Sequence, residues 1–171
     1  DRYFVEGNVG YNGSEAFDPV NRYGTFPAFG IGWVPSNEKF FQPIKNVISY
    51  LKFRYSDGLT GIGRVSNDKR FAYLDLMSEN IAGYRFDRNL SNTSGINITE
   101  YGAEVVWAES RKQDLGMEIK TLNDRLSLMV DVFKEKRTGI FLLRASIPMY
   151  LGLNSLPWGN LGVVENKGFD A

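Results

Sequence analysis

A strict alternation of apolar and polar residues is the feature that most constrains this chain. In residues 2–12 every second side chain belongs to one set, which comprises Tyr3, Val5, Gly7, Val9 and Tyr11. The intervening set is mostly polar and comprises Phe4, Glu6, Asn8, Gly10 and Asn12. A period of two indicates a β-strand with two unlike faces. One such strand fits a half-buried sheet in a soluble protein as well as a sheet that faces lipid.

The same pattern predicts further strands and the loops between them. Strands are expected at 25–34, 49–59, 113–122 and 125–135, and a last strand is expected to begin near Lys167. Asn123-Asp124 is a two-residue turn signal, which predicts a hairpin between the fourth and fifth strands. We therefore expect an all-β chain of five strands and the start of a sixth. Loops are predicted at 13–21, over the long irregular stretch 60–110 and at 138–166, with a short helical turn after Ser36.

Composition excludes several classes of function. The chain has no cysteine and no histidine, which removes disulfides, thiolate nucleophiles, the usual zinc sites and imidazole catalysis. Its formal net charge is zero, so electrostatics give no reason to expect nucleic-acid binding. The apolar run 140–143 ends at Arg144, far short of the roughly 20 residues of a membrane helix. A membrane-embedded form of this chain would therefore have to use strands.

The sequence offers no catalytic pair that withstands a distance test. Asp114 and Glu118 fall on one strand face, about 13 Å apart at about 3.3 Å per residue, which is too far for either geometry of glycoside hydrolysis. The glycines at 58, 61 and 63 follow a strand but lack the lysine and helix start of a phosphate-binding loop. We expect a non-enzymatic protein with no cofactor and no metal.

Four stretches of the chain resemble the SusC/RagA-like family of TonB-dependent outer-membrane proteins. They are Trp-Val-Pro-Ser-Asn-Glu-Lys-Phe-Phe at 33–41, Leu-Lys-Phe-Arg-Tyr-Ser-Asp-Gly at 51–58, the segment 107–134 with its Trp107 and Asn123-Asp124 turn, and 147–168 with its Asn160-Leu-Gly-Val-Val-Glu-Asn-Lys-Gly motif. Departures from the family pattern occur at three places. Asp57 stands where the family has an apolar or aromatic residue, Ala108 separates Trp107 from Glu109, and Phe133 replaces a tyrosine.

The resemblance implies a transmembrane antiparallel β-barrel of about 22 strands in the bacterial outer membrane, in contact with its lipid. Five or six strands cannot close such a barrel, so residues 1–171 are expected to be part of a single barrel domain, which the resemblance places C-terminal in the longer protein. The plug domain, the TonB-contacting N-terminal region and the remaining strands would then lie outside this chain. The implied function is TonB-dependent import of oligosaccharides, or of peptides, together with a SusD-like surface lipoprotein.

Candidate functional residues follow from the strand faces and the loops. Polar residues expected to face the barrel lumen are Glu6, Asn8, Lys52, Arg54, Asp114, Glu118, Lys120 and Asp131. Candidate ligand contacts in loops are Arg64, Tyr73, Tyr150 and Trp158, for which packing within the loops is the alternative. The alternative architecture is a soluble β-sandwich that binds carbohydrate. The face of Leu126, Leu128, Val130 and Val132 separates the two, because a sandwich would bury it and a barrel would expose it to lipid.

Overall fold

The computed structural model describes residues 1–63, 65, 70–83 and 94–171, and its regular elements are nearly all strands. The strands are β1 (Tyr3–Gly13), β2 (Tyr23–Trp33), β3 (Ile48–Ile62), β4 (Leu76–Ala82), β5 (Ser94–Glu100), β6 (Ala108–Thr121), β7 (Leu126–Leu143) and β8 (Trp158–Asp170). Short 3₁₀ helices are η1 (Pro35–Asn37), η2 (Lys39–Ile44) and η4 (Met149–Leu151). Within the described residues, none of the helical segments has the length and apolar content needed to cross a membrane.

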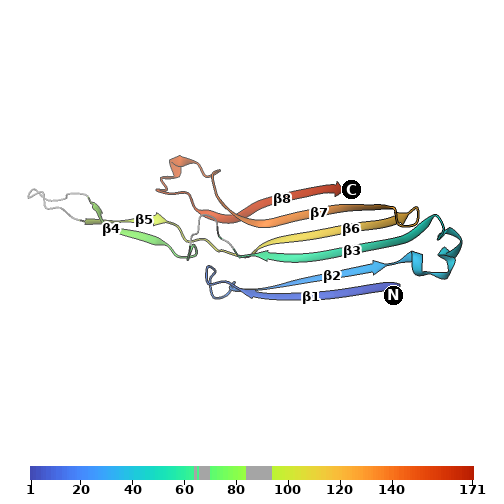
Figure 1. Ribbon diagram of the computed structural model, residues 1–171. Helices are drawn as coiled ribbons and strands as arrows, with labels where there is room; N and C mark the ends of the chain where they lie inside the picture. The colour runs from blue at the N-terminus through green and yellow to red at the C-terminus, as the bar shows by residue number, and fades with distance from the viewer. Residues whose placement is uncertain (64, 66–69, 84–93) are drawn as a thin grey trace, which may run out of the picture.

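Six long strands form one open antiparallel sheet in the order β1-β2-β3-β6-β7-β8 (Figure 1). β4 and β5 pair only with each other, and their hairpin projects beyond one end of the large sheet. In the described part of the chain no second sheet packs against the large one, as a sandwich would require. Leu126, Leu128 and Val132 are 46–54% exposed, which contradicts burial of their face in this chain.

The connections lie at two opposite ends of the sheet, and we call the end that carries the long insertion between β3 and β6 the long-loop end. Segments 14–22 and 144–157 and the described parts of 63–107 lie at the end from which β4 and β5 project, while 34–47 and 122–125 lie at the opposite end (Figure 1). The predicted hairpin at Asn123-Asp124 is confirmed, because Thr121 on β6 pairs with Leu126 on β7. The turn spans four residues, 122–125, instead of the predicted two, and Leu122, Asn123 and Asp124 have φ of 55°, 55° and 64°. Asn and Asp tolerate this conformation better than other non-glycine residues.

The predicted loop over 138–166 is wrong at both of its ends. β7 continues to Leu143, and β8 begins at Trp158 instead of near Lys167. Gly139 adopts a φ of 71°, and the register between β7 and β8 shifts between Arg137 and Ile140. A glycine in this left-handed conformation lets the strand absorb a bulge and continue, whereas the sequence pattern suggests an interruption. The predicted irregular stretch 60–110 likewise contains the β4–β5 hairpin.

A small apolar core joins the loops at the long-loop end. Phe17, Val65, Val105 and Phe141 are at most 5% exposed and come from four separate segments of the chain. The ring of Trp107 packs at 4.9 Å from Phe17 and 5.2 Å from Phe26, centroid to centroid. Burial of several aromatic side chains at one place gives these loops a fixed arrangement on the sheet.

Candidate functional site

The strand register sorts the side chains of the large sheet onto two unlike faces. Directly paired residues of antiparallel strands lie on the same face, so the pairing can be followed across the sheet. One such row crosses all six strands and is apolar or aromatic throughout, with Val5, Ile31, Tyr55, Leu115, Val132 and Phe169 as its members. We call this side the apolar face. Its members are largely uncovered, for example Val5 at 84% and Phe169 at 75%.

The opposite side, the polar face, carries the residues that the sequence assigned to a lumen. One paired row runs through Arg54, Gly116 and Asp131, and adjacent rows on the same side hold the other members, Glu6, Asn8, Lys52, Asp114, Glu118 and Lys120. All of these predicted residues therefore share one face of the sheet. That this face borders a lumen stays a prediction.

Arg54 and Asp131 form an ion pair on the polar face that spans the strand between them. Nη2 of Arg54 lies 2.6 Å from both carboxylate oxygens of Asp131, although β6 separates their strands. The intervening residue is Gly116, where a Cβ atom would sit 2.3 Å from both side chains. The missing side chain is what lets the guanidinium reach across β6. The predicted lumen residues are thus partly paired with one another, and Lys120 similarly lies 3.8 Å from Glu118.

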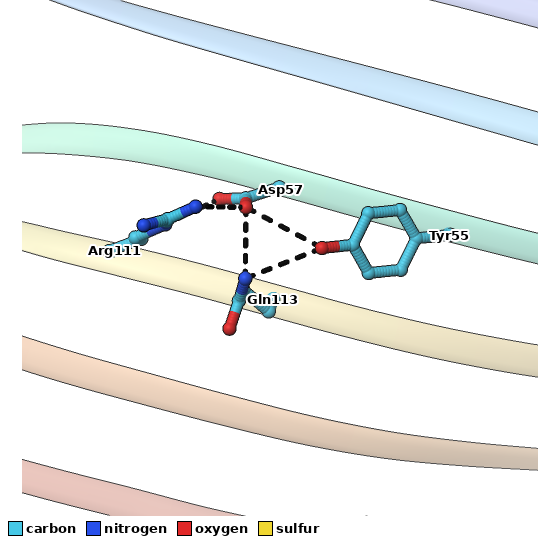
Figure 2. A network of polar contacts seen from close by, with 4 residues as sticks. All are labelled: Tyr55, Asp57, Arg111 and Gln113. Carbon is cyan, nitrogen blue, oxygen red and sulfur yellow. Dashed lines mark hydrogen bonds and ion pairs between the residues drawn. The ribbon is translucent and has the colours of Figure 1, made fainter.

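Asp57 is the centre of a polar network on the otherwise apolar face (Figure 2). Its Oδ1 accepts a hydrogen bond from Nε of Arg111 at 3.0 Å, and its Oδ2 accepts from Nη2 of the same residue at 2.6 Å. Gln113 donates to Oδ2 at 2.9 Å, and the hydroxyl of Tyr55 lies beside both residues. The side chain of Asp57 is only 8% exposed, so its charge is compensated by fork-like contacts from the neighbouring strand.

Sequence reasoning singled out Asp57 as a departure from the family pattern but missed its partners. Arg111 and Gln113 lie on β6, more than fifty positions along the chain, and only the β3–β6 register places them opposite. One signal in the sequence could have found them. Arg111 and Gln113 lie at even spacing from Leu115, so all three side chains lie on the same face of the strand, where the two polar residues stand out.

Asn160 is a second residue whose role the sequence did not reveal. Its Oδ1 accepts a hydrogen bond from the backbone N–H of Val106 at 3.1 Å, and its Nδ2 donates to the Val106 and Gly139 carbonyls at 2.9 and 2.5 Å. The amide therefore completes backbone hydrogen bonding where the segment before β6 passes the bulge of β7. It acts as a clamp between the loop core and the sheet.

The candidate ligand contacts in the loops have different environments. Trp158 stacks on Phe141 at 5.5 Å between ring centroids, and Tyr73 packs against the loop core, so both contribute to packing. Tyr150 in η4 is 86% exposed and is open to a ligand. Arg64 lies outside the described residues. Among the residues that the structure describes, no three His, Cys, Asp or Glu side chains gather as around a metal ion.

Comparison with known proteins finds similarity to TonB-dependent receptors. No family model matches it. The chain is 30% identical over 172 residues to the TonB-dependent receptor SusC of Bacteroides thetaiotaomicron, with 99% of the chain and 17% of that protein covered. It is 28% identical over 170 residues to the TonB-dependent receptor P39 of Formosa agariphila, with 99% and 15% covered.

Solved structures agree in fold. The RagAB peptide importer in its closed-closed state superposes with a TM-score of 0.75 and 24% identity, over 99% of the chain and 17% of that chain. Its open-open state gives a TM-score of 0.77 over 98% of the chain. The chain thus spans about one sixth of the length of these relatives, 15–17%. Motifs, sheet and sequence similarity along the whole of this chain agree, and the chain is similar to a segment of TonB-dependent receptors such as SusC.

Proposed function

We propose that this chain forms part of the wall of an outer-membrane β-barrel that imports nutrients and is energised through TonB. The observation that carries the proposal is the apolar row that crosses all six strands from Val5 to Phe169 and stays uncovered. A soluble monomer rarely leaves so continuous an apolar surface in water. Lipid contact on that side, with polar residues on the other, is the arrangement that a barrel wall requires.

The edges of the sheet support a larger barrel. β1 and β8 each pair with one strand only among the described residues, so each leaves a row of backbone donors and acceptors without a strand partner. Such edges are not tolerated in the hydrocarbon layer, where every backbone polar group needs a partner. We infer that residues 1–171 belong to a single barrel domain and that further strands of the same protein cover both edges.

The insertion between β3 and β6, which is the longest connection between strands of the large sheet, suggests an orientation for the wall. Outer-membrane barrels have short turns on the periplasmic side and long loops on the extracellular side. The loop core around Phe17 and Trp107 and the exposed Tyr150 would therefore lie outside the cell. There they would meet the substrate and a SusD-like surface lipoprotein, in line with the similarity to SusC.

The cargo in this proposal is an oligosaccharide, with a peptide as the second candidate. SusC-like similarity over the whole chain favours the first, and the fold shared with the RagAB peptide importer favours the second. In either case the polar face around Arg54 and Lys52 offers hydrogen-bond donors and acceptors to a passing solute. Transport of this kind involves no covalent chemistry, and TonB would act through parts of the protein outside this chain.

Uptake by cells tests the proposal. The full-length gene is deleted and restored, and entry of fluorescently labelled oligosaccharides and short peptides is followed in both strains and in a strain without TonB. We expect one cargo class to enter only when both the receptor and TonB are present. Undiminished uptake of both classes in the deletion strain would refute an import function, and the class that is lost identifies the cargo.

A further inference from the structure

On β3, β6, β7 and β8, polar and charged residues follow the apolar row in the direction of the long loops. The row after Tyr55, Leu115, Val132 and Phe169 consists on the same four strands of Asp57, Gln113, Lys134 and Lys167. One row farther toward the loops, Arg111 pairs with Lys136, which pairs with Glu165. On these four strands apolar side chains thus give way to polar or charged ones within two residues, whereas on β2 the same row is continued by Phe29. We call the residues Arg111, Lys134, Lys136 and Lys167 the cationic band.

Charge within this band is only partly compensated. Arg111 is paired with Asp57 at 2.6 Å, and Lys134 with Glu165 at 3.0 Å. Lys136 and Lys167 are exposed, and neither forms a salt bridge with a described residue. Four cations against two carboxylates leave two positive charges on this part of the face. The next carboxylate, Glu109, lies one row farther toward the loops.

The distance from the apolar edge places these lysines at the depth of lipid headgroups. Lys134 and Lys167 lie two residues beyond the row of Val132 and Phe169, about 7 Å along the strand and about 5 Å along the membrane normal at a tilt of about 40°. The headgroup layer is roughly 5 to 7 Å thick on each side of the hydrocarbon. Lys136 lies two residues farther out, and its flexible side chain is long enough to bend back toward that layer.

We propose that the cationic band binds the phosphate groups of anionic lipids in the outer leaflet, with Lys136 and Lys167 as the principal contacts. The proposal rests on the membrane placement in the proposed function, but it concerns the lipid around the barrel and not the cargo within it. A lysine near a membrane surface attracts anionic lipid by about 1 kcal/mol, which corresponds to about a fivefold change in affinity. The Asp57–Arg111 network supports the same edge by fixing the strand residues where apolar surface ends.

Native mass spectrometry of the full-length receptor in detergent micelles tests this site. Monophosphoryl lipid A is titrated into the wild type and into the double variant Lys136→Gln/Lys167→Gln, with phosphatidylcholine as the zwitterionic comparison. The matched control is Lys112→Gln/Lys120→Gln, which removes two lysines from the polar face. A Lys136→Arg/Lys167→Arg variant keeps the charge, and its binding should be close to that of the wild type.

We expect the Gln variant of the band to bind lipid A about 25-fold more weakly, since two lysines are removed at about fivefold each, while the control stays within twofold of wild type. Equal lipid A binding by the two Gln variants would overturn the proposal, as would competition by inorganic phosphate that exceeds the effect of sodium chloride at equal ionic strength. Should the band variant fail to fold, the wild type still decides it. Preference for lipid A over phosphatidylcholine must then decrease with added salt. A receptor that stays soluble without detergent would instead contradict the membrane placement itself.

Discussion

Replacing Gly116 with alanine tests how the polar face of the sheet is held together. The added Cβ atom would lie 2.3 Å from Nε of Arg54 and 2.3 Å from Oδ1 of Asp131, distances that real Cβ atoms do not show. Backbone shifts are restricted because Gly116 pairs with Arg54 on one side and Asp131 on the other. The guanidinium must therefore withdraw, and its 2.6 Å contact with Asp131 is lost.

The expected size of the effect follows from three contributions. Losing the ion pair costs about 0–1 kcal/mol, since the Arg54 side chain is 48% exposed and water replaces part of the interaction. Crowding by the added methyl group costs about 1–3 kcal/mol where neighbours cannot relax freely. Alanine in place of glycine returns about 0.5–1 kcal/mol through the lower entropy of the unfolded strand. The net result is a local destabilisation of about 1–2 kcal/mol.

Hydrogen exchange measured by mass spectrometry on the full-length receptor in micelles detects a change of this size locally. A loss of about 1–2 kcal/mol lowers the protection of β6 and β7 amides by roughly 5- to 30-fold. Gly30→Ala is the matched control, because a Cβ there meets only atoms at 3.8 Å or beyond on the same face. Unchanged protection in Gly116→Ala, or an equal loss in Gly30→Ala, would show that the Arg54–Asp131 contact does not depend on the glycine.

Three further substitutions test the faces and the loops. Leu128→Arg on the apolar face should cost about 2–4 kcal/mol if that face meets lipid near the midplane, and it should lower the amount of heat-modifiable receptor in outer membranes. The control Ser127→Arg changes the polar face and should assemble normally. Equal assembly of the two variants would argue against lipid contact. Phe17→Ala removes a ring that is 1% exposed and should cost about 3–5 kcal/mol of stability. It should also speed protease cleavage in the long loops. The control Phe40→Ala removes a ring that is 64% exposed and should leave the cleavage rate unchanged. Asn160→Asp should destabilise the contact between β8 and the segment before β6 more than Asn160→Ala does, because a carboxylate would face the carbonyls of Val106 and Gly139. Hydrogen exchange of the β8 amides should therefore be faster in Asn160→Asp than in Asn160→Ala. The opposite order of exchange rates would contradict the clamp.

The sequence alone determined that the chain folds into strands, and which residues share one face of each strand. Alternation in residues 2–12 and 113–135 requires strands whose two sides differ, and Asn123-Asp124 specifies the tight turn between two of them. These signals are local, since the period, the turn residues and the absence of long apolar runs are read within a few positions. The same local parity is why the predicted lumen residues from Glu6 to Asp131 all fall on one face.

Only the tertiary structure decided what depends on register between distant strands. Asp57 meets Arg111 and Gln113 because β3 pairs with β6 across the whole insertion of β4 and β5, and no local pattern specifies that alignment. The span of Arg54 over Gly116 and the cationic band beside Val132 and Phe169 arise in the same way. The continuation of β7 past Gly139 could not be predicted from the sequence for a related reason. A glycine looks like a break in sequence, but hydrogen bonds from the neighbouring strand and the Asn160 clamp hold the chain extended around the bulge.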